Sequence, residues 1–133
     1  MKKLLIFLFV CASVSLMAQN KELTTFFDNG MIKSRYVYTN AQTYTVTNYF
    51  QSGKAMETGS FLNGKMDGYW VTYNELGMKT AEAFYKGGDK TGDWKVFDET
   101  GSLRYKITYD ANKIVSATNF DSAGRSVAET HAR

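Results

Sequence analysis

The fold of this chain is decided by the stretch GKAMETGSFLNGKMDGYWVTYNELG, residues 53–77. The residues on both sides repeat its pattern, because the motif aromatic-x-x-x-Gly recurs five times at steps of 23, 24, 24 and 23 residues. The five motifs are Phe26–Gly30, Tyr49–Gly53, Tyr73–Gly77, Phe97–Gly101 and Phe120–Gly124. A fixed period of this length indicates an array of stacked structural repeats.

Two turn signals inside the repeats predict β-hairpins. Asn63-Gly64 separates two extended runs, and Gly87-Gly88 stands at the same place 24 residues later. Asn-Gly is a strong hairpin signal, because both central residues of a type I′ turn need a positive φ. The first and fourth copies carry weaker turn formers, Asn40-Ala41 and Ala111-Asn112, as expected of repeats near the ends of an array.

Beyond the N-terminal segment, the sequence shows no sustained apolar stripe of helical period. We therefore predict an all-β fold, in which antiparallel hairpins of about 23–24 residues stack into one elongated, twisted sheet. Residues 19–25 are interpreted as a polar lead-in and residues 26–124 as four hairpins plus a partial fifth. Residues 125–133 form either a tail or one last strand.

Pairing across the Asn63-Gly64 turn predicts which side chains share a face. If Leu62 pairs with Lys65, one face of this repeat combines aromatic and very small residues, and the other is polar. The predicted first face holds Glu57, Gly59, Phe61, Met66, Gly68, Trp70 and Thr72, and Lys65 and Asp67 lead the second. In this register Gly59 lies opposite Gly68, and in the next repeat Ala83 lies opposite Gly92. Each pair leaves bare backbone that an aromatic ring can cover.

The aromatic residues admit two interpretations. Most are expected to form the core, because a thin sheet has little else to bury. Alternatively, some rings remain exposed and stack on a partner, for which Tyr and Trp are suited by a flat ring with a polar group. The candidate partner-binding residues are Trp70, Trp94, Tyr85, Tyr105 and Glu57, the last being a charge on the aromatic face. The residues expected to build the repeat are Gly30, Gly53, Gly59, Gly64, Gly68, Tyr73, Gly77, Gly88, Gly92, Phe97, Gly101 and Gly124.

The first 18 residues have the pattern of a secretory signal peptide. Lys2 and Lys3 precede an apolar run that ends at the small residue Ala18, after which we expect cleavage. An uncleaved anchor and lipidation at Cys11 are the alternatives. Removing residues 1–18 lowers the formal net charge from +3 to +1 and leaves no cysteine. The sequence therefore predicts export to the periplasm, the envelope or the exterior, without disulfides and without a basic surface for nucleic acid.

Catalytic and metal chemistry find little support. The single histidine, His131, lies in the C-terminal tail, and the mature chain offers no thiol nucleophile. Asp67, Asp89 and Asp93 lie near hairpin tips on the predicted polar face, where a solubilising role is expected rather than paired-carboxylate hydrolysis. The Gly- and Asp-containing turns lack the ligand spacing of a calcium loop. We predict no enzyme activity, no cofactor and no metal.

The second repeat resembles the MORN repeat in its bacterial variant form, found in proteins of the YwqK-like antitoxin family. The resemblance rests on Gly59-x-Phe61-x-Asn63-Gly64-Lys65-x-x-Gly68-x-Trp70-x-x-Tyr73-x-x-x-Gly77 and on a degraded copy from Ala83 to Gly101. Tryptophan at positions 70 and 94, where MORN repeats usually carry glycine, indicates the variant group. The resemblance implies a non-enzymatic binding or scaffolding module.

The expected partner is a protein, recognised along the sheet surface or at an exposed edge strand. Antitoxin-like neutralisation of a toxin partner, which the family resemblance implies, is one alternative. Association of the aromatic face with envelope lipid or glycan is another.

Overall fold

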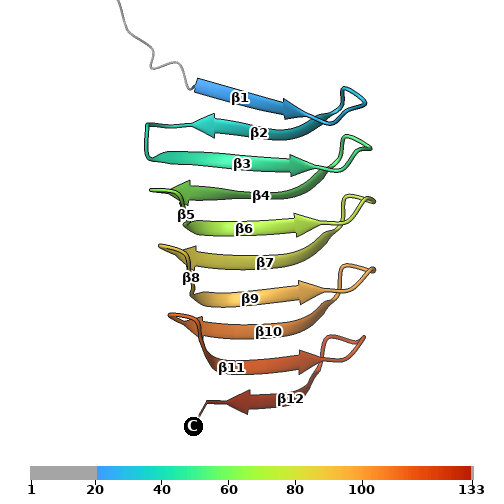
Figure 1. Ribbon diagram of the computed structural model, residues 1–133. Helices are drawn as coiled ribbons and strands as arrows, with labels where there is room; N and C mark the ends of the chain where they lie inside the picture. Colours follow the sequence, from blue (N-terminus) through green and yellow to red (C-terminus); the bar gives the residue numbers. More distant parts are fainter. Residues whose placement is uncertain (1–20, 133) are drawn as a thin grey trace, which may run out of the picture.

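The computed structural model describes residues 21–132 and shows one open antiparallel sheet in which successive strands lie side by side (Figure 1). The two-residue strands β5 and β8 pair antiparallel with the C-terminal ends of β4 and β7. This confirms the predicted all-β architecture of repeated hairpins. The strands are β1 (Lys21–Phe26), β2 (Ile32–Tyr38), β3 (Thr43–Tyr49), β4 (Ala55–Leu62), β5 (Lys65–Met66), β6 (Gly68–Tyr73), β7 (Lys79–Lys86), β8 (Asp89–Lys90), β9 (Gly92–Phe97), β10 (Leu103–Asp110), β11 (Lys113–Phe120) and β12 (Ser126–His131).

The N-terminal end of the array differs from the sequence-based boundary. The supposed lead-in at residues 21–25 is part of β1, which pairs with β2 from Lys21 to Phe26. These residues show no hydrophobic period because β1 is an edge strand and is largely exposed on both faces. At the other end, β12 is the last strand that the sequence allowed as one of two outcomes. The predicted signal peptide, residues 1–18, lies outside the described residues.

The aromatic-x-x-x-Gly motifs build the turns that follow β1, β3, β6, β9 and β11, all on the same side of the sheet (right in Figure 1). In the second of them, Phe50 N–H donates to the Lys54 carbonyl at 2.8 Å and Gly53 N–H donates to the Phe50 carbonyl at 2.9 Å. The same pair of bonds recurs in the other four turns, and each turn glycine has φ between 75° and 87°. Glycine is required here because this backbone conformation is strained for residues with a Cβ.

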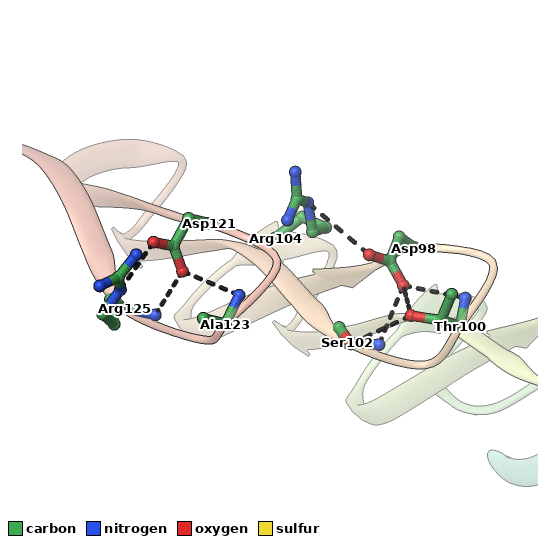
Figure 2. A network of polar contacts seen from close by, with 7 residues as sticks. All are labelled: Asp98, Thr100, Ser102, Arg104, Asp121, Ala123 and Arg125. Atoms are coloured by element: carbon green, nitrogen blue, oxygen red, sulfur yellow. Dashed lines mark hydrogen bonds and ion pairs between the residues drawn. The ribbon is translucent and has the colours of Figure 1, made fainter.

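Three of these turns are reinforced by the side chain that directly follows the aromatic residue. Asn74, Asp98 and Asp121 each accept hydrogen bonds from backbone N–H groups two and four residues later, at 2.9–3.0 Å. Figure 2 shows two of them, in which Arg104 Nε lies 3.8 Å from Asp98 Oδ2 and Arg125 Nε lies 2.9 Å from Asp121 Oδ2. The hydrogen bond from the Thr100 hydroxyl is the main cause that lowers the pKa of Asp98, and the backbone N–H of Arg125 has this effect on Asp121.

The opposite ends of the strands contain the tight hairpins. Asn63 and Gly64 have φ of 51° and 75°, and Leu62 pairs with Lys65 and Phe61 with Met66, as the turn signal predicts. Beyond Met66 the register shifts by two residues, so that Glu57 pairs with Thr72. The shift is made at Asp67 and at Gly68, whose φ is 84°.

The predicted glycine pairs are therefore wrong. In the shifted register, which pairs Thr58 with Val71 and Glu82 with Lys95, the next residues opposite Gly59 and Ala83 are Trp70 and Trp94, not Gly68 and Gly92. Both glycines form bulges with positive φ, and their backbone conformation explains them. Because the shift is an even number of residues, the predicted division of side chains between the two faces survives it.

In the described part of the chain, the sheet is a single layer without a conventional core. Among the described residues, the buried side chains are those of Ser34, Val46, Trp70 and Val71. Both faces and both edge strands are therefore available to solvent. The expectation that most aromatic residues are core is met fully by Trp70 alone among the described residues. Many other rings are half-buried, and Phe26, Tyr69, Phe84 and Tyr105 are exposed.

Candidate binding face

One face of the sheet carries a continuous row of rings, which we call the aromatic face. Neighbouring ring centroids in it lie 5.0–6.3 Å apart, within the range of favourable aromatic contacts. It consists of Tyr36, Tyr38, Tyr44, Phe61, Trp70, Tyr85, Trp94 and Tyr109. These residues come from strands β2 to β10, so the row connects several repeats.

Trp70 is the anchor of this face. Its indole covers Gly59, where an added Cβ would lie only 2.0 Å from Trp70 Cδ2. Its Nε1 donates to the Ser60 carbonyl at 3.1 Å, and only 6% of the residue is exposed. Gly59 thus makes room for an aromatic ring, as predicted. The shifted register is what brings the Trp70 ring over it.

Trp94 occupies the equivalent place in the next repeat with less burial. Its Nε1 donates to the Phe84 carbonyl at 3.1 Å, which repeats the bond of Trp70. The position equivalent to Gly59 is here Ala83, and Trp94 is only half-buried.

Glu57 lies at the margin of the aromatic face within a short polar chain. Ser34 Oγ donates to Asn48 Oδ1 at 2.7 Å, and Asn48 Nδ2 donates to Glu57 Oε1 at 2.7 Å. Ser34 is buried, with 6% of its surface exposed. The buried hydroxyl holds the side chain of Asn48 in place, and Asn48 in turn holds Glu57. Sequence reasoning missed Ser34 and Asn48, because the turn that joins β2 to β3 lacks a clear two-residue signal.

A shallow hollow of about 440 Å³ opens between the rings and this polar chain. Asn48 also lines an adjoining hollow of about 520 Å³, beside Phe27, Phe50 and Met56. The first hollow is lined by Tyr36, Tyr44, Val46, Asn48, Glu57, Phe61, Met66 and Trp70. The structure thus brings together two predicted partner-binding residues, Trp70 and Glu57, at one site.

The other three candidates lie further along the sheet. Tyr85 contacts both tryptophans, with centroids at 6.3 Å from Trp70 and 5.0 Å from Trp94. Burial is the main cause that raises the pKa of Tyr85, and the negative charge of Glu57 adds to it. Tyr105 pairs with Val96 and Asn119, is 48% exposed, and makes none of the ring contacts.

A lysine side chain of the protein itself lies on the aromatic face in the third repeat. Lys90 Nζ lies 4.8 Å from the Trp94 ring centroid and 5.2 Å from that of Tyr109. Ammonium groups at such distances from ring faces are attracted by the ring quadrupole. Pairing across the Gly87-Gly88 turn already predicts that Lys90 shares a face with Tyr85 and Trp94, but not that its ammonium lies over the rings.

The opposite face, which we call the polar face, carries mainly polar side chains and changes character along the sheet. It also holds one pair of rings, Tyr69 and Phe84, whose centroids lie 5.1 Å apart. Near the second repeat it carries hydroxyl contacts, with Thr47 and Thr58 at 3.0 Å and Thr45 and Ser60 at 3.4 Å. Near the third repeat, Glu82 bridges Lys79 and Lys95.

Asp93 continues this charged region, since it accepts from Thr108 Oγ1 at 2.7 Å and lies 3.0 Å from Lys106 Nζ. The hydrogen bond from Lys79 is the main cause that lowers the pKa of Glu82, and that from Thr108 has this effect on Asp93.

The remaining chemistry-bearing residues have local partners. Asp67 accepts from Gly87 N–H at 2.9 Å, and Asp89 accepts from Asn112 Nδ2 at 2.6 Å. His131 Nε2 lies 3.6 Å from Glu129 Oε1 on the exposed strand β12. Within residues 21–132, no group of three or more His, Cys, Asp or Glu side chains is arranged to hold a metal, and no helix is long and apolar enough to cross a membrane.

Comparison with known proteins supports the repeat type. The MORN repeat variant family matches residues 90–111, which run from β8 through β10 and cover one repeat of the chain. This repeat type suggests a binding or scaffolding module. No curated protein matches the chain.

Two solved structures resemble the sheet. One is the crystal structure of TarM, at 13% identity, and the other is an S. aureus TarM mutant in complex with Fondaparinux, alpha-GlcNAc-glycerol and UDP, at 12% identity. Each has a TM-score of 0.48 and covers 71% of this chain and 20% of the TarM chain. This chain therefore spans about a fifth of the length of those proteins.

Proposed function

We propose that the chain is an exported, non-catalytic binding module that recognises a protein partner across the aromatic face. The observation that carries the proposal is a row of eight contacting rings on a single-layer sheet, of which only Trp70 is buried. Half-exposed Tyr and Trp rings supply large contact area with little loss of side-chain entropy, as in the energetic centres of protein interfaces. Export rests on the basic and apolar pattern of residues 2–18.

The open edges offer a second contact region for the same partner. Leu23 and Phe26 on β1 are 49% and 60% exposed, and Val127 on β12 is 62% exposed. Unpaired strand edges are templates for strand addition by a partner. Recognition by a face and recognition by an edge predict different contact positions, so a positional experiment separates them.

Site-specific photo-crosslinking in the producing cells tests the proposal. A photoreactive phenylalanine analogue at Tyr85 should form an adduct with one protein, and the purified pair should then reconstitute a complex of fixed stoichiometry. The matched control is the same analogue at Lys95, which pairs with Glu82 on the polar face and should yield no such adduct. An analogue at Leu23 reports on edge contact.

Adducts with lipid or glycan alone would replace the protein partner by an envelope component. Equal yields from Tyr85 and Lys95 would refute face-specific recognition. If the captured partner proved to be a toxin, the family-implied antitoxin role would become the specific form of this function.

A further inference from the structure

Lys90 shows that the aromatic face can hold an ammonium group. Its Nζ lies near two ring faces, those of Trp94 and Tyr109, at 4.8 and 5.2 Å. The chain supplies this cation itself, from the short strand β8 that follows the Gly87-Gly88 turn. The third repeat therefore carries an occupied cation position on its rings.

The second repeat has the corresponding rings but no corresponding cation. The residue 24 positions before Lys90 is Met66, which lines the 440 Å³ hollow together with Phe61 and Trp70. The described lining of this hollow contains no Lys or Arg. A neutral thioether thus stands where the next repeat places its ammonium.

The same hollow carries a negative charge instead. Glu57 is half-buried, its Oε1 is held by Asn48 Nδ2, and no ion pair to Glu57 is found among residues 21–132. A carboxylate in partly dry surroundings is stabilised by an opposite charge, so the hollow is electrostatically suited to a cation. The Ser34–Asn48 chain holds that carboxylate in one orientation.

We propose that this hollow binds a lysine or arginine side chain of the protein partner, which makes it the specific pocket of the proposed binding function and rests on that function. The aliphatic stem of such a side chain would pack on Val46, Met66 and the rings, and its charged end would reach Glu57. A hydrogen-bonded carboxylate favours a cation with N–H donors over a quaternary ammonium, which has none.

The test uses a capped tetralysine peptide, with the same peptide acetylated at every side-chain amine as the neutral comparison. Binding is followed by tryptophan fluorescence and by the NMR signal of the Trp70 indole N–H. We expect a saturable change with the charged peptide at a Kd of about 1 mM or below, and none with the acetylated peptide.

Three variants locate the site. Glu57→Gln keeps an acceptor for Asn48 but removes the charge, and it should weaken binding about tenfold. Met66→Lys introduces the residue of the third repeat, which should occupy the hollow and weaken binding to a similar extent. Glu99→Gln is the matched control, because Glu99 is an exposed turn residue, and its affinity should stay within about twofold of the wild type.

The proposal fails if the acetylated peptide binds equally, or if neither Glu57→Gln nor Met66→Lys weakens binding. It also fails if phosphatidylcholine vesicles bind and the charged peptide does not, since the cation would then be a lipid headgroup. Thermal unfolding verifies that each variant is folded. If Glu57→Gln does not fold, the effect of Met66→Lys on peptide binding alone tests the proposal. A persistent Tyr85 adduct without peptide binding would refute the lysine or arginine pocket and leave the binding module intact.

Discussion

The second and third repeats have the same backbone and treat their tryptophans differently. Trp70 and Trp94 make the same hydrogen bond, from Nε1 to a strand carbonyl at 3.1 Å. Beneath Trp70 lies Gly59, and the ring occupies the space of the missing side chain. The third repeat has Ala83 at this position, and its tryptophan is half-buried where Trp70 is buried.

On a single-layer sheet, a small change in the neighbouring side chain distinguishes a ring that stabilises the fold from a ring that is exposed enough to bind a partner. Within residues 21–132 no second layer covers these indoles, so the side chain directly underneath has a large influence on their burial. One methyl group, present at Ala83 and absent at Gly59, accompanies the change from an anchor to a half-exposed ring. Repeats with identical hydrogen bonding can therefore divide structural and binding roles between them.

The largest expected effect is a difference between the two tryptophan deletions. Trp70→Ala should lower the free energy of unfolding by about 3–5 kcal/mol, because it removes a buried ring and leaves a void over Gly59. Trp94→Ala should cost about 1–2 kcal/mol, because its ring buries less surface. Urea denaturation followed by circular dichroism measures both, and equal losses would contradict the distinction between the two repeats.

A smaller effect is expected from Gly59→Ala, which gives the second repeat the residue of the third. The new Cβ would overlap the Trp70 ring, so the indole must move outward at a cost of about 1–3 kcal/mol. Tryptophan emission in a Trp94→Phe background should shift to longer wavelength as Trp70 becomes exposed.

The reverse change, Ala83→Gly, is the matched control for that prediction. A strand glycine costs about 0.5–1 kcal/mol, and deeper seating of Trp94 offsets part of this, so the net change should stay below about 1 kcal/mol. Emission in a Trp70→Phe background should shift to shorter wavelength. A red shift or no shift in this variant would show that residue 83 does not control the ring.

The smallest expected effect concerns pH and the polar face, where the two repeats also differ. Hydrogen bonding lowers the pKa of Glu82 and Asp93 and raises that of Lys79. The carboxylate contributions are therefore present at neutral pH and lost as the pH falls below about 4, and the Lys79 contribution is lost above about pH 10. Each half-exposed pair contributes no more than about 1 kcal/mol.

Hydrogen exchange at acidic pH measures where this loss occurs. Amides of β7 and β9 should lose protection before those of β4 and β6, because the hydroxyl contacts Thr47–Thr58 and Thr45–Ser60 do not titrate in this range. Glu82→Gln should remove much of the difference. Equal loss of protection in both repeats, unchanged by that substitution, would assign the acid sensitivity to other groups.

The regular features of the fold could be predicted from sequence because local chemistry dictates them. Asn63-Gly64 determined the pairing of Leu62 with Lys65, and the glycine of each aromatic-x-x-x-Gly motif marked a turn that needs positive φ. The two-residue shift at Gly68 could not be predicted, because a glycine in a strand marks either a bulge or a packing site. Gly59 and Gly68 represent one case each, and only their backbone conformations distinguish them.

The candidate site was predictable in part for a similar reason. Trp70 and Glu57 could be assigned to one face by alternation along β4 and β6. Ser34 and Asn48 lie on β2 and β3, whose connecting turn lacks a two-residue signal. The turn at Gly87-Gly88 predicts the face on which Lys90 lies, but not its contact with Tyr109 of the next repeat. The contacts of Asn48 with Glu57 and of Lys90 with Tyr109 join different repeats, whereas turn residues specify pairing within one repeat.

The absence of a conventional core in the described sheet has a consequence for how such a chain can change over generations. Each strand depends only on its two neighbours, and the five aromatic-x-x-x-Gly turns are built by the same backbone bonds. A duplicated or deleted unit of about 24 residues would leave every remaining strand with the neighbours that it needs. The length of the ribbon, and with it the number of rings presented in a row, is therefore open to selection independently of the fold.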